Sequence, residues 1–173
     1  MPEVLLALGS NVGDRLANLR DALEALGTKL DLLAVSAIYE TAPMYVVEQQ
    51  PFLNAALRAQ TGCYPLELLR LLKQTETEVG RQTGQRFGPR EIDIDLIAYG
   101  SLKYSLKGGD RDLELPHPRV AERRFVLQPL FDVDPDGRLP GLGTIRELLA
   151  RTEDQAQDVH RIEHALLPVL GNR

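Results

Sequence analysis

The segment 81–97, RQTGQRFGPREIDIDLI, places an Asp-x-Asp pair directly after a loop that contains glycine and arginine. Side chains alternate along residues 92–99, so Asp93, Asp95, Ile97 and Tyr99 share one face, and the apolar Ile92, Ile94, Leu96 and Ala98 share the other. The two carboxylates then stand side by side on one face, and their Cα atoms are about 6.6 Å apart at about 3.3 Å per residue. Bare carboxylates at this spacing repel, whereas Mg²⁺ takes one or two protein carboxylates together with water and substrate phosphates. The pair therefore predicts a metal site.

The loop before this pair carries a strong positive charge. Arg81, Arg86 and Arg90 lie within ten residues that include no acidic residue. Three guanidinium groups suit an anion more highly charged than a single carboxylate, such as a polyphosphate. An amphipathic strand whose acidic face only contacts water is the alternative for Asp93 and Asp95 taken alone. The arginines favour a phosphate clamp next to a metal.

Composition sets a frame for this chemistry. The 173 residues, with 43% hydrophobic and 26% charged residues, predict a single globular domain over residues 1–173. A net charge of -5 argues against a general nucleic-acid surface. Cys63 is the only cysteine, which excludes an internal disulfide and a zinc site of the ribbon kind. No apolar run has membrane-spanning length and no basic leader precedes one, so we expect a cytoplasmic protein without a membrane partner.

The elements that position the motif follow the order strand, helix, strand, strand, helix, strand. Strands are predicted at residues 4–8, 32–41, 52–60 and 92–99, and helices at residues 16–26 and 65–79. Asp14 begins the first helix, Pro65 begins the second, and Gly80 ends it. This order is typical of a ferredoxin-like α+β fold, a mainly antiparallel sheet with helices packed on one face. We expect the active site on the other face and its rim.

The strand at residues 52–60 indicates what that other face binds. Phe52 and Asn54 lie opposite its apolar side. An aromatic ring beside an amide that both donates and accepts suits a flat nitrogen heterocycle. An aromatic side chain shielded by the neighbouring loop is the alternative for Phe52. The segment 39–44, YETAPM, reaches the same end of the sheet, where Pro43 would hold its backbone.

These motifs resemble one enzyme family. The sequence RFGPREIDIDLI, together with LGSN at 8–11, YETAP at 39–43, FLNAA at 52–56 and LPHPRVAERRFVLQPL at 115–130, is similar to 6-hydroxymethyl-7,8-dihydropterin pyrophosphokinases. The resemblance runs in consistent order to about Phe131 and implies a ferredoxin-like fold. It implies Mg²⁺-dependent transfer of pyrophosphate from ATP to the pterin hydroxymethyl group, giving AMP and the pterin diphosphate of folate biosynthesis. Residues 138–173 match poorly, and we expect an extension of the same domain there.

The resemblance also implies roles for single residues. Asp93 and Asp95 would hold two Mg²⁺ ions, and Arg81 and Arg90 would be the catalytic arginines at the two ends of the loop. Catalysis would then rest on positioning and charge stabilisation, under a loop that Gly84 and Gly88 allow to close. The implied ATP contacts are Glu76, Arg81, Arg90, Ile97, His117 and Arg123. For His117 the alternative is a turn residue locked between two prolines.

For the pterin, the matching positions are Thr41, Ala42, Pro43, Met44, Phe52, Asn54 and Phe125. Phe52 and Phe125 would stack on the ring, each such pair contributing about 0.5–1.5 kcal/mol beyond burial. A plain core position is the alternative for Phe125. The chain departs from the family in a loop one residue shorter, in Phe87 where tryptophan is frequent, and in Lys73 where some members have glutamine.

Two other classes of protein share parts of this pattern. A ferredoxin-like regulatory module would bind a small ligand without turnover, but it has no use for both the Asp-x-Asp pair and the loop arginines. A nucleotidyltransferase also uses an Asp-x-Asp pair with two metals. The product distinguishes them, because pyrophosphoryl transfer leaves AMP whereas nucleotidyl transfer leaves pyrophosphate.

Overall fold

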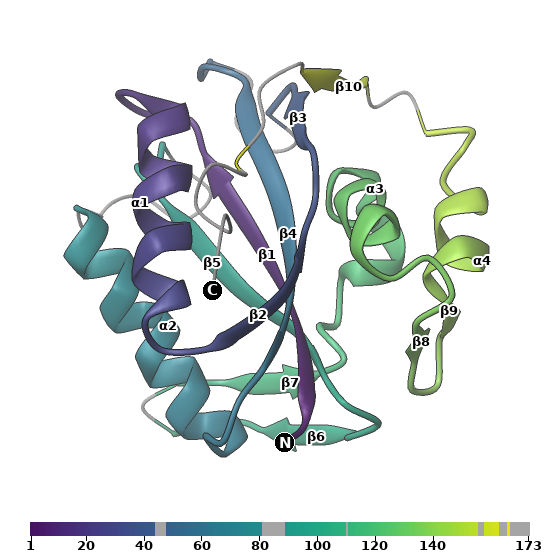
Figure 1. Ribbon diagram of the computed structural model, residues 1–173. Coiled ribbons are helices and arrows are strands. Elements are labelled where there is room, and N and C mark those ends of the chain that lie inside the picture. Colours follow the sequence, from purple (N-terminus) through teal and green to yellow (C-terminus); the bar gives the residue numbers. More distant parts are fainter. Residues whose placement is uncertain (44–47, 81–88, 110, 156–157, 163–165, 167–173) are drawn as a thin grey trace.

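The computed structural model describes residues 1–43, 48–80, 89–109, 111–155, 158–162 and 166 (Figure 1). The first part of the chain forms β1 (Glu3–Ser10), α1 (Arg15–Gly27), β2 (Asp31–Val35), β3 (Ile38–Thr41), β4 (Phe52–Gln60), α2 (Pro65–Val79) and β5 (Asp93–Tyr99). The second part forms β6 (Tyr104–Leu106), β7 (Leu113–Leu115), a 3₁₀ turn (Val120–Glu122), α3 (Arg124–Val133), β8 (Arg138–Leu139), β9 (Gly143–Thr144), α4 (Ile145–Ala150) and β10 (Val159–Ile162). None of the described helices is long and apolar enough to cross a membrane.

The main sheet has the strand order β10-β3-β4-β1-β5, and β2 also pairs with β4. All of these pairings are antiparallel. The helices α1 and α2 come from the two crossovers of the predicted strand and helix order. The mixed α/β architecture with a mainly antiparallel sheet is therefore confirmed. The small hairpins β6-β7 and β8-β9 lie outside this sheet.

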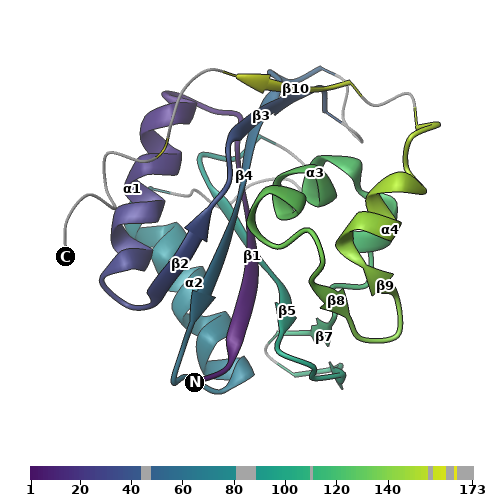
Figure 2. The ribbon, with the colours of Figure 1, turned by 45° about the vertical axis from the view of Figure 1, so that its right-hand side comes forward.

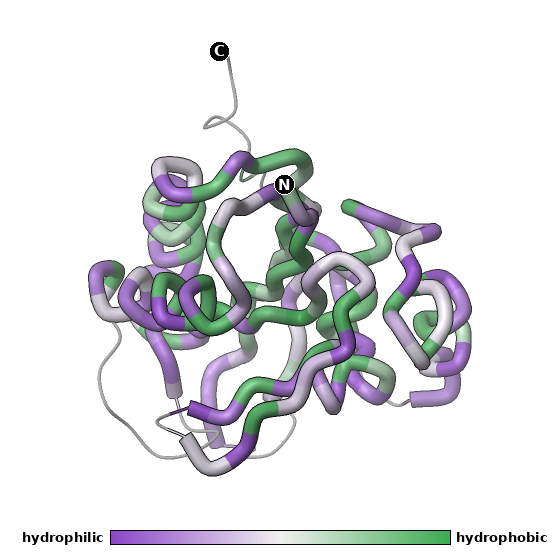
Figure 3. The backbone as a smooth tube through the Cα atoms, turned by 90° about the horizontal axis from the view of Figure 1, so that it is seen from below, coloured by the Kyte–Doolittle hydropathy of each residue, from purple (hydrophilic) through white to green (hydrophobic). Residues whose placement is uncertain are grey.

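Helices cover both faces of the sheet (Figures 1 and 2). On one face, α1 and α2 bury a core that includes Leu23, Leu57 and Leu72. On the other face, α3 and α4 bury a second core that includes Leu127 and Ile145. The layer on this second face comes from the part of the chain after the β-α-β-β-α-β unit. Figure 3 shows hydrophobic segments along the central strands and hydrophilic segments on the outer turns.

The ends of the predicted helices follow from their capping residues. Asp14 accepts a hydrogen bond from the backbone N–H of Ala17 at 3.0 Å and so begins α1. Gly80 ends α2 with φ of 115°, a left-handed conformation that favours glycine. Thr144 and Glu147 form a capping box at the start of α4.

The prediction of one strand over residues 32–41 was wrong, because the strand is interrupted between β2 and β3. Ser36 lies at the break and is buried. Its hydroxyl accepts from the Ala56 backbone N–H at 2.8 Å and donates to the Ala37 carbonyl at 2.6 Å. A side chain that bonds to the backbone in this way competes with the regular strand ladder.

The predicted alternation along β5 was also wrong at its last two residues. Leu5 of β1 pairs with Ala98, whereas Leu6 pairs with Leu96, so Ile97 is an extra residue in a β-bulge. Ala98 consequently packs in the α3 core together with Ile97. Tyr99 packs against the opposite core, where its hydroxyl donates to the Cys63 carbonyl at 2.8 Å.

Candidate functional site

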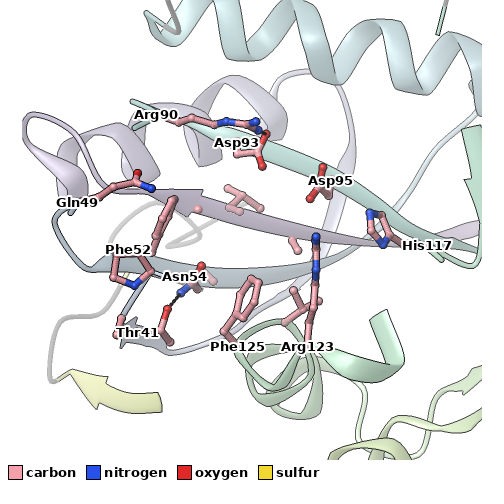
Figure 4. Close-up of a pocket in the computed structure, with 17 residues that line it drawn as sticks. Thr41, Gln49, Phe52, Asn54, Arg90, Asp93, Asp95, His117, Arg123 and Phe125 are labelled. Atoms are coloured by element: carbon pink, nitrogen blue, oxygen red, sulfur yellow. Dashed lines mark hydrogen bonds and ion pairs between the residues drawn. The ribbon is translucent and has the colours of Figure 1, made fainter. Parts of the chain in front are cut away.

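A cavity of about 260 Å³ lies on the side of the sheet that α3 covers (Figure 4). Strands β1, β4 and β5, the segment after β3 and the start of α3 all contribute to its wall. The predicted site residues that line it are Thr41, Ala42, Pro43, Phe52, Asn54, Arg90, Asp93, Asp95, His117, Arg123 and Phe125. The structure thus gathers into one cavity residues that lie more than 80 positions apart in the sequence.

Asp93 and Asp95 form the acidic part of this cavity. They lie across from Gly9 and Ala7 of β1, whose small side chains leave space beside the carboxylates. Burial, followed by the neighbouring Asp93 carboxylate, raises the pKa of Asp95 to about 6. Arg90 donates to Asp93 Oδ1 at 2.9 Å. A divalent cation beside these two acids would favour the charged form of Asp95.

The donor set fits Mg²⁺ in particular. Among the described residues, no group of three or more His, Cys, Asp or Glu side chains is placed to hold a metal. Mg²⁺ needs only one or two carboxylates when phosphate oxygens and water complete its shell.

His117 lies near the acidic pair and is held by its backbone and its ring. Its backbone N–H donates to the Ile97 carbonyl at 2.8 Å, and its ring Nδ1 accepts from the Arg119 backbone N–H at 3.2 Å. A ring nitrogen that accepts carries no proton, so Nε2 is the donor. Burial, followed by the positive charge of Arg123, lowers the pKa of His117 to about 4. The ring is therefore neutral at pH 7 and can donate one hydrogen bond to an anion.

Arg123 and Phe125 extend from the start of α3 into the cavity (Figure 4). The Arg123 guanidinium lies 5.7 Å from the centre of the Phe125 ring, within cation–π range. The Phe125 ring thus lies beside the positive charge of Arg123, which could bind a phosphate group. Phe125 lines the cavity and also packs at the edge of the α3 core, and its stacking on a pterin ring stays a prediction.

The amide of Asn54 is fixed in orientation by its neighbour. Asn54 Nδ2 donates to Thr41 Oγ1 at 2.8 Å, and both side chains are buried. Phe52 enters the same region of the cavity from the start of β4, and Phe125 enters it from α3 (Figure 4). An oriented amide between two aromatic side chains can read the polar edge of a flat ring while its faces are covered.

Several predicted residues lie elsewhere. The side chain of Ile97 is buried in the α3 core, and its carbonyl anchors His117. Glu76 is buried behind β5 and does not line the cavity. Arg81 and Met44, with the loop glycines Gly84 and Gly88, lie outside the described residues.

Sequence reasoning missed Gln49 and the role of Asn11. Gln49 lines the cavity, and the buried Asn11 donates to Gln49 Oε1 at 3.0 Å and to the Gln50 carbonyl at 3.2 Å. Asn11 Oδ1 also accepts from the Arg90 N–H at 2.8 Å. The signal was available, because an asparagine directly after a buried strand often binds nearby backbone groups.

Comparisons with known proteins show which family this chain matches. The family model described as 7,8-dihydro-6-hydroxymethylpterin-pyrophosphokinase (HPPK) matches residues 5–135. A Mycobacterium tuberculosis protein, 2-amino-4-hydroxy-6-hydroxymethyldihydropteridine pyrophosphokinase, is 42% identical over 171 residues, which is 94% of this chain and 90% of that protein. The mitochondrial folate synthesis bifunctional protein of Pisum sativum is 46% identical over 132 residues, 76% of this chain and 25% of that protein.

Solved structures give the same fold. The crystal structure of Plasmodium falciparum HPPK-DHPS with SDX-DHP superposes with a TM-score of 0.70 at 17% identity, covering 90% of this chain and 45% of that chain. At this identity the likeness concerns the fold alone. The chain spans about a quarter of the length of the bifunctional plant proteins that it matches.

Proposed function

The chain belongs to the 7,8-dihydro-6-hydroxymethylpterin-pyrophosphokinase family, and from this premise we propose that it transfers pyrophosphate from ATP to 6-hydroxymethyl-7,8-dihydropterin. The products are AMP and the pterin diphosphate, and the reaction belongs to folate biosynthesis. One observation carries the proposal. Two carboxylates, three groups that can bind phosphate and two aromatic side chains around an oriented amide line the same cavity.

The two ends of the cavity divide the substrates between them. Arg90, His117 and Arg123 would bind the phosphate oxygens of ATP near the acidic pair. Phe52, Asn54 and Phe125 would bind the pterin ring, and the backbone of residues 41–44 would hold its edge. The hydroxymethyl group then lies between the ring and the phosphates, where it can attack.

The reaction itself needs positioning more than a strong base. The hydroxymethyl oxygen forms a bond to the β-phosphorus, the bond from the β-phosphorus to the oxygen bridging to the α-phosphorus breaks, and AMP departs with that oxygen. The hydroxyl proton passes to solvent. Arg90 and Arg123 would stabilise the charge that develops on the phosphoryl oxygens, and the Nε2–H of His117 would donate to them. Two Mg²⁺ ions held by Asp93 and Asp95 would neutralise phosphate charge and align the two substrates.

The released nucleotide tests the proposal. We expect a mixture of the protein, ATP, Mg²⁺ and the hydroxymethyl-dihydropterin to give AMP and pterin diphosphate in equal amounts, measured by liquid chromatography. ADP as the main product would mean transfer of one phosphate, and free pyrophosphate would mean nucleotidyl transfer. Either outcome contradicts the proposal.

A matched variant connects this activity to the acidic pair. Asp95→Asn keeps the size of the side chain and removes the charge that a metal requires. We expect turnover to fall at least about 10²–10³-fold, the scale on which loss of one stabilising group acts. An unchanged rate in a folded Asp95→Asn protein would contradict the role of this carboxylate.

A further inference from the structure

The strand that carries the two acids lies at an edge of the sheet. Within the described residues, β5 hydrogen-bonds as a strand only to β1. The other side of an edge strand presents backbone N–H and C=O groups that no neighbouring strand binds. The positions of Asp93 and Asp95 therefore depend on what holds this outer side.

Two side chains of α2 bind the outer side of β5 between the two acids. Glu76 Oε1 accepts from the Ile94 N–H at 2.7 Å, and Lys73 Nζ donates to the Ile94 carbonyl at 3.1 Å. Lys73 and Glu76 also bind each other at 2.7 Å, one helical turn apart. Together they bind the N–H and the C=O of one residue, as a residue of a neighbouring strand would.

The position of Ile94 gives these bonds their importance. The N–H of Ile94 belongs to the peptide unit that follows Asp93, and its carbonyl belongs to the peptide unit that precedes Asp95. These two planar units are the only backbone that joins the two acidic residues. Holding both units fixes the direction in which one carboxylate points relative to the other.

The burial of this pair adds a further constraint. The side chain of Glu76 is 2% exposed and that of Lys73 is 21% exposed. A buried carboxylate needs a cation and hydrogen bonds to remain charged. Lys73 supplies the cation while Ile94 supplies a donor, so the pair is stable only where the β5 backbone passes.

We propose that Lys73 and Glu76 are positioning residues that replace a missing neighbouring strand and hold Asp93 and Asp95 in the geometry that divalent cations require. The inference rests on the proposed function only in taking these two aspartates as the metal-holding groups. It gives Glu76 a role behind the metal site in place of a direct contact with ATP.

Metal binding without turnover tests this role. We would titrate Mn²⁺ into the protein with an ATP analogue that has a methylene group between the α- and β-phosphorus, and measure bound Mn²⁺ by electron paramagnetic resonance. Lys73→Met keeps the length of the side chain and loses its donors. We expect Mn²⁺ to bind about 10- to 100-fold more weakly, the usual effect of removing a group that orients metal ligands. Lys73→Leu is the second variant should Lys73→Met not fold.

Two further variants separate positioning from general effects. Lys73→Gln retains N–H donors for the Ile94 carbonyl and for Glu76, so we expect binding within about threefold of wild type, well short of the loss expected for a removed orienting group. Glu78 lies on the same helix as Lys73, and its ion pair with Lys29 joins α2 to the turn after α1 instead of β5. Glu78→Gln weakens that ion pair. This control should leave Mn²⁺ binding unchanged.

Two results would overturn the inference. One is wild-type Mn²⁺ binding in folded Lys73→Met. The other is an equal loss in Lys73→Met and Lys73→Gln, because charge alone would then explain it. A wild-type protein that forms no AMP would contradict the proposed function, whereas the Mn²⁺ comparison needs no reaction and would keep its meaning.

Discussion

At the scale of single residues, Gly9 of β1 leaves room for two side chains of the cavity. Gly9 pairs with Asn54 of β4 on one side and with Asp93 of β5 on the other. A Cβ atom built on Gly9 would lie 3.3 Å from Asn54 Oδ1 and 3.6 Å from Phe52 Cδ1. The absence of a side chain at Gly9 therefore leaves the amide and the aromatic ring in the orientation that the cavity needs.

We expect Gly9→Ala to weaken binding of the pterin about tenfold, or about 1.4 kcal/mol, because the new methyl group displaces the amide of Asn54. Binding of ATP should change much less. Calorimetric titration with each ligand measures both effects. Gly62→Ala is the control, since a Cβ at that glycine meets no atom within 4 Å. A similar loss for both ligands would contradict a local effect at the ring.

The buried histidine predicts a dependence of stability on pH. The pKa of His117 falls from its ordinary value of 6.5 to about 4 in the folded protein. Between these values the unfolded chain binds a proton that the folded protein does not, so the free energy of unfolding decreases as the pH falls. The contribution is complete above pH 6.5 and is lost as the pH falls through 4.

We expect His117→Gln to lose less stability than wild type between pH 7 and pH 4, with a difference of about 1–3 kcal/mol. Urea unfolding at several pH values measures this. His160→Gln serves as the control, because His160 is exposed on β10. Parallel pH curves for wild type and His117→Gln would show that the imidazole does not cause the acid sensitivity.

At the scale of elements, the attachment of α3 to the sheet depends on Asp132. This carboxylate accepts from the Ala37 N–H at 3.1 Å and from the Tyr39 hydroxyl at 3.0 Å. Burial, followed by the hydrogen bond to Asp132, raises the pKa of Tyr39 to about 12. The bonds fasten α3 at the break between β2 and β3, where the backbone has left the regular ladder.

Loss of this carboxylate removes the acceptor of the Ala37 N–H and one partner of the partly buried Tyr39 hydroxyl. We expect Asp132→Ala to lower the free energy of unfolding by about 1–3 kcal/mol. Asp136→Ala removes an exposed partner of Arg146 and should cost less than about 1 kcal/mol. Urea unfolding at pH 7 compares the two variants. Equal costs would contradict the special role of the α3 contact.

The same scale shows what the sequence could predict. The ends of α2 and the whole of β4 followed from local signals, namely Pro65, Gly80 and a regular alternation from Phe52. The break at Ser36 and the bulge at Ile97 did not, because both depend on neighbouring strands. A ladder partner decides whether an alternating segment remains regular, and periodicity within one segment carries no information about that partner.

At the scale of the whole molecule, the site was more predictable than the support behind it. Residues that line the cavity had distinctive types and spacing, such as Asp93, Asp95 and His117. The contacts of Lys73 and Glu76 with the β5 backbone were not predicted, because only the packing of α2 against β5 brings them together. Arg81 and Met44 remain predictions.

The bulge in β5 has an effect on how changes spread through the molecule. Upstream of Ile97 the strand turns its acids toward the cavity, and downstream its last residue, Tyr99, turns toward the layer of α1 and α2. A change in side-chain size at Tyr99 would therefore alter the packing of the layer formed by α1 and α2 and leave the cavity unchanged. The extra residue in the bulge thus separates the packing of Tyr99 from that of Asp93 and Asp95, so substitutions at one end of β5 need not affect the other end.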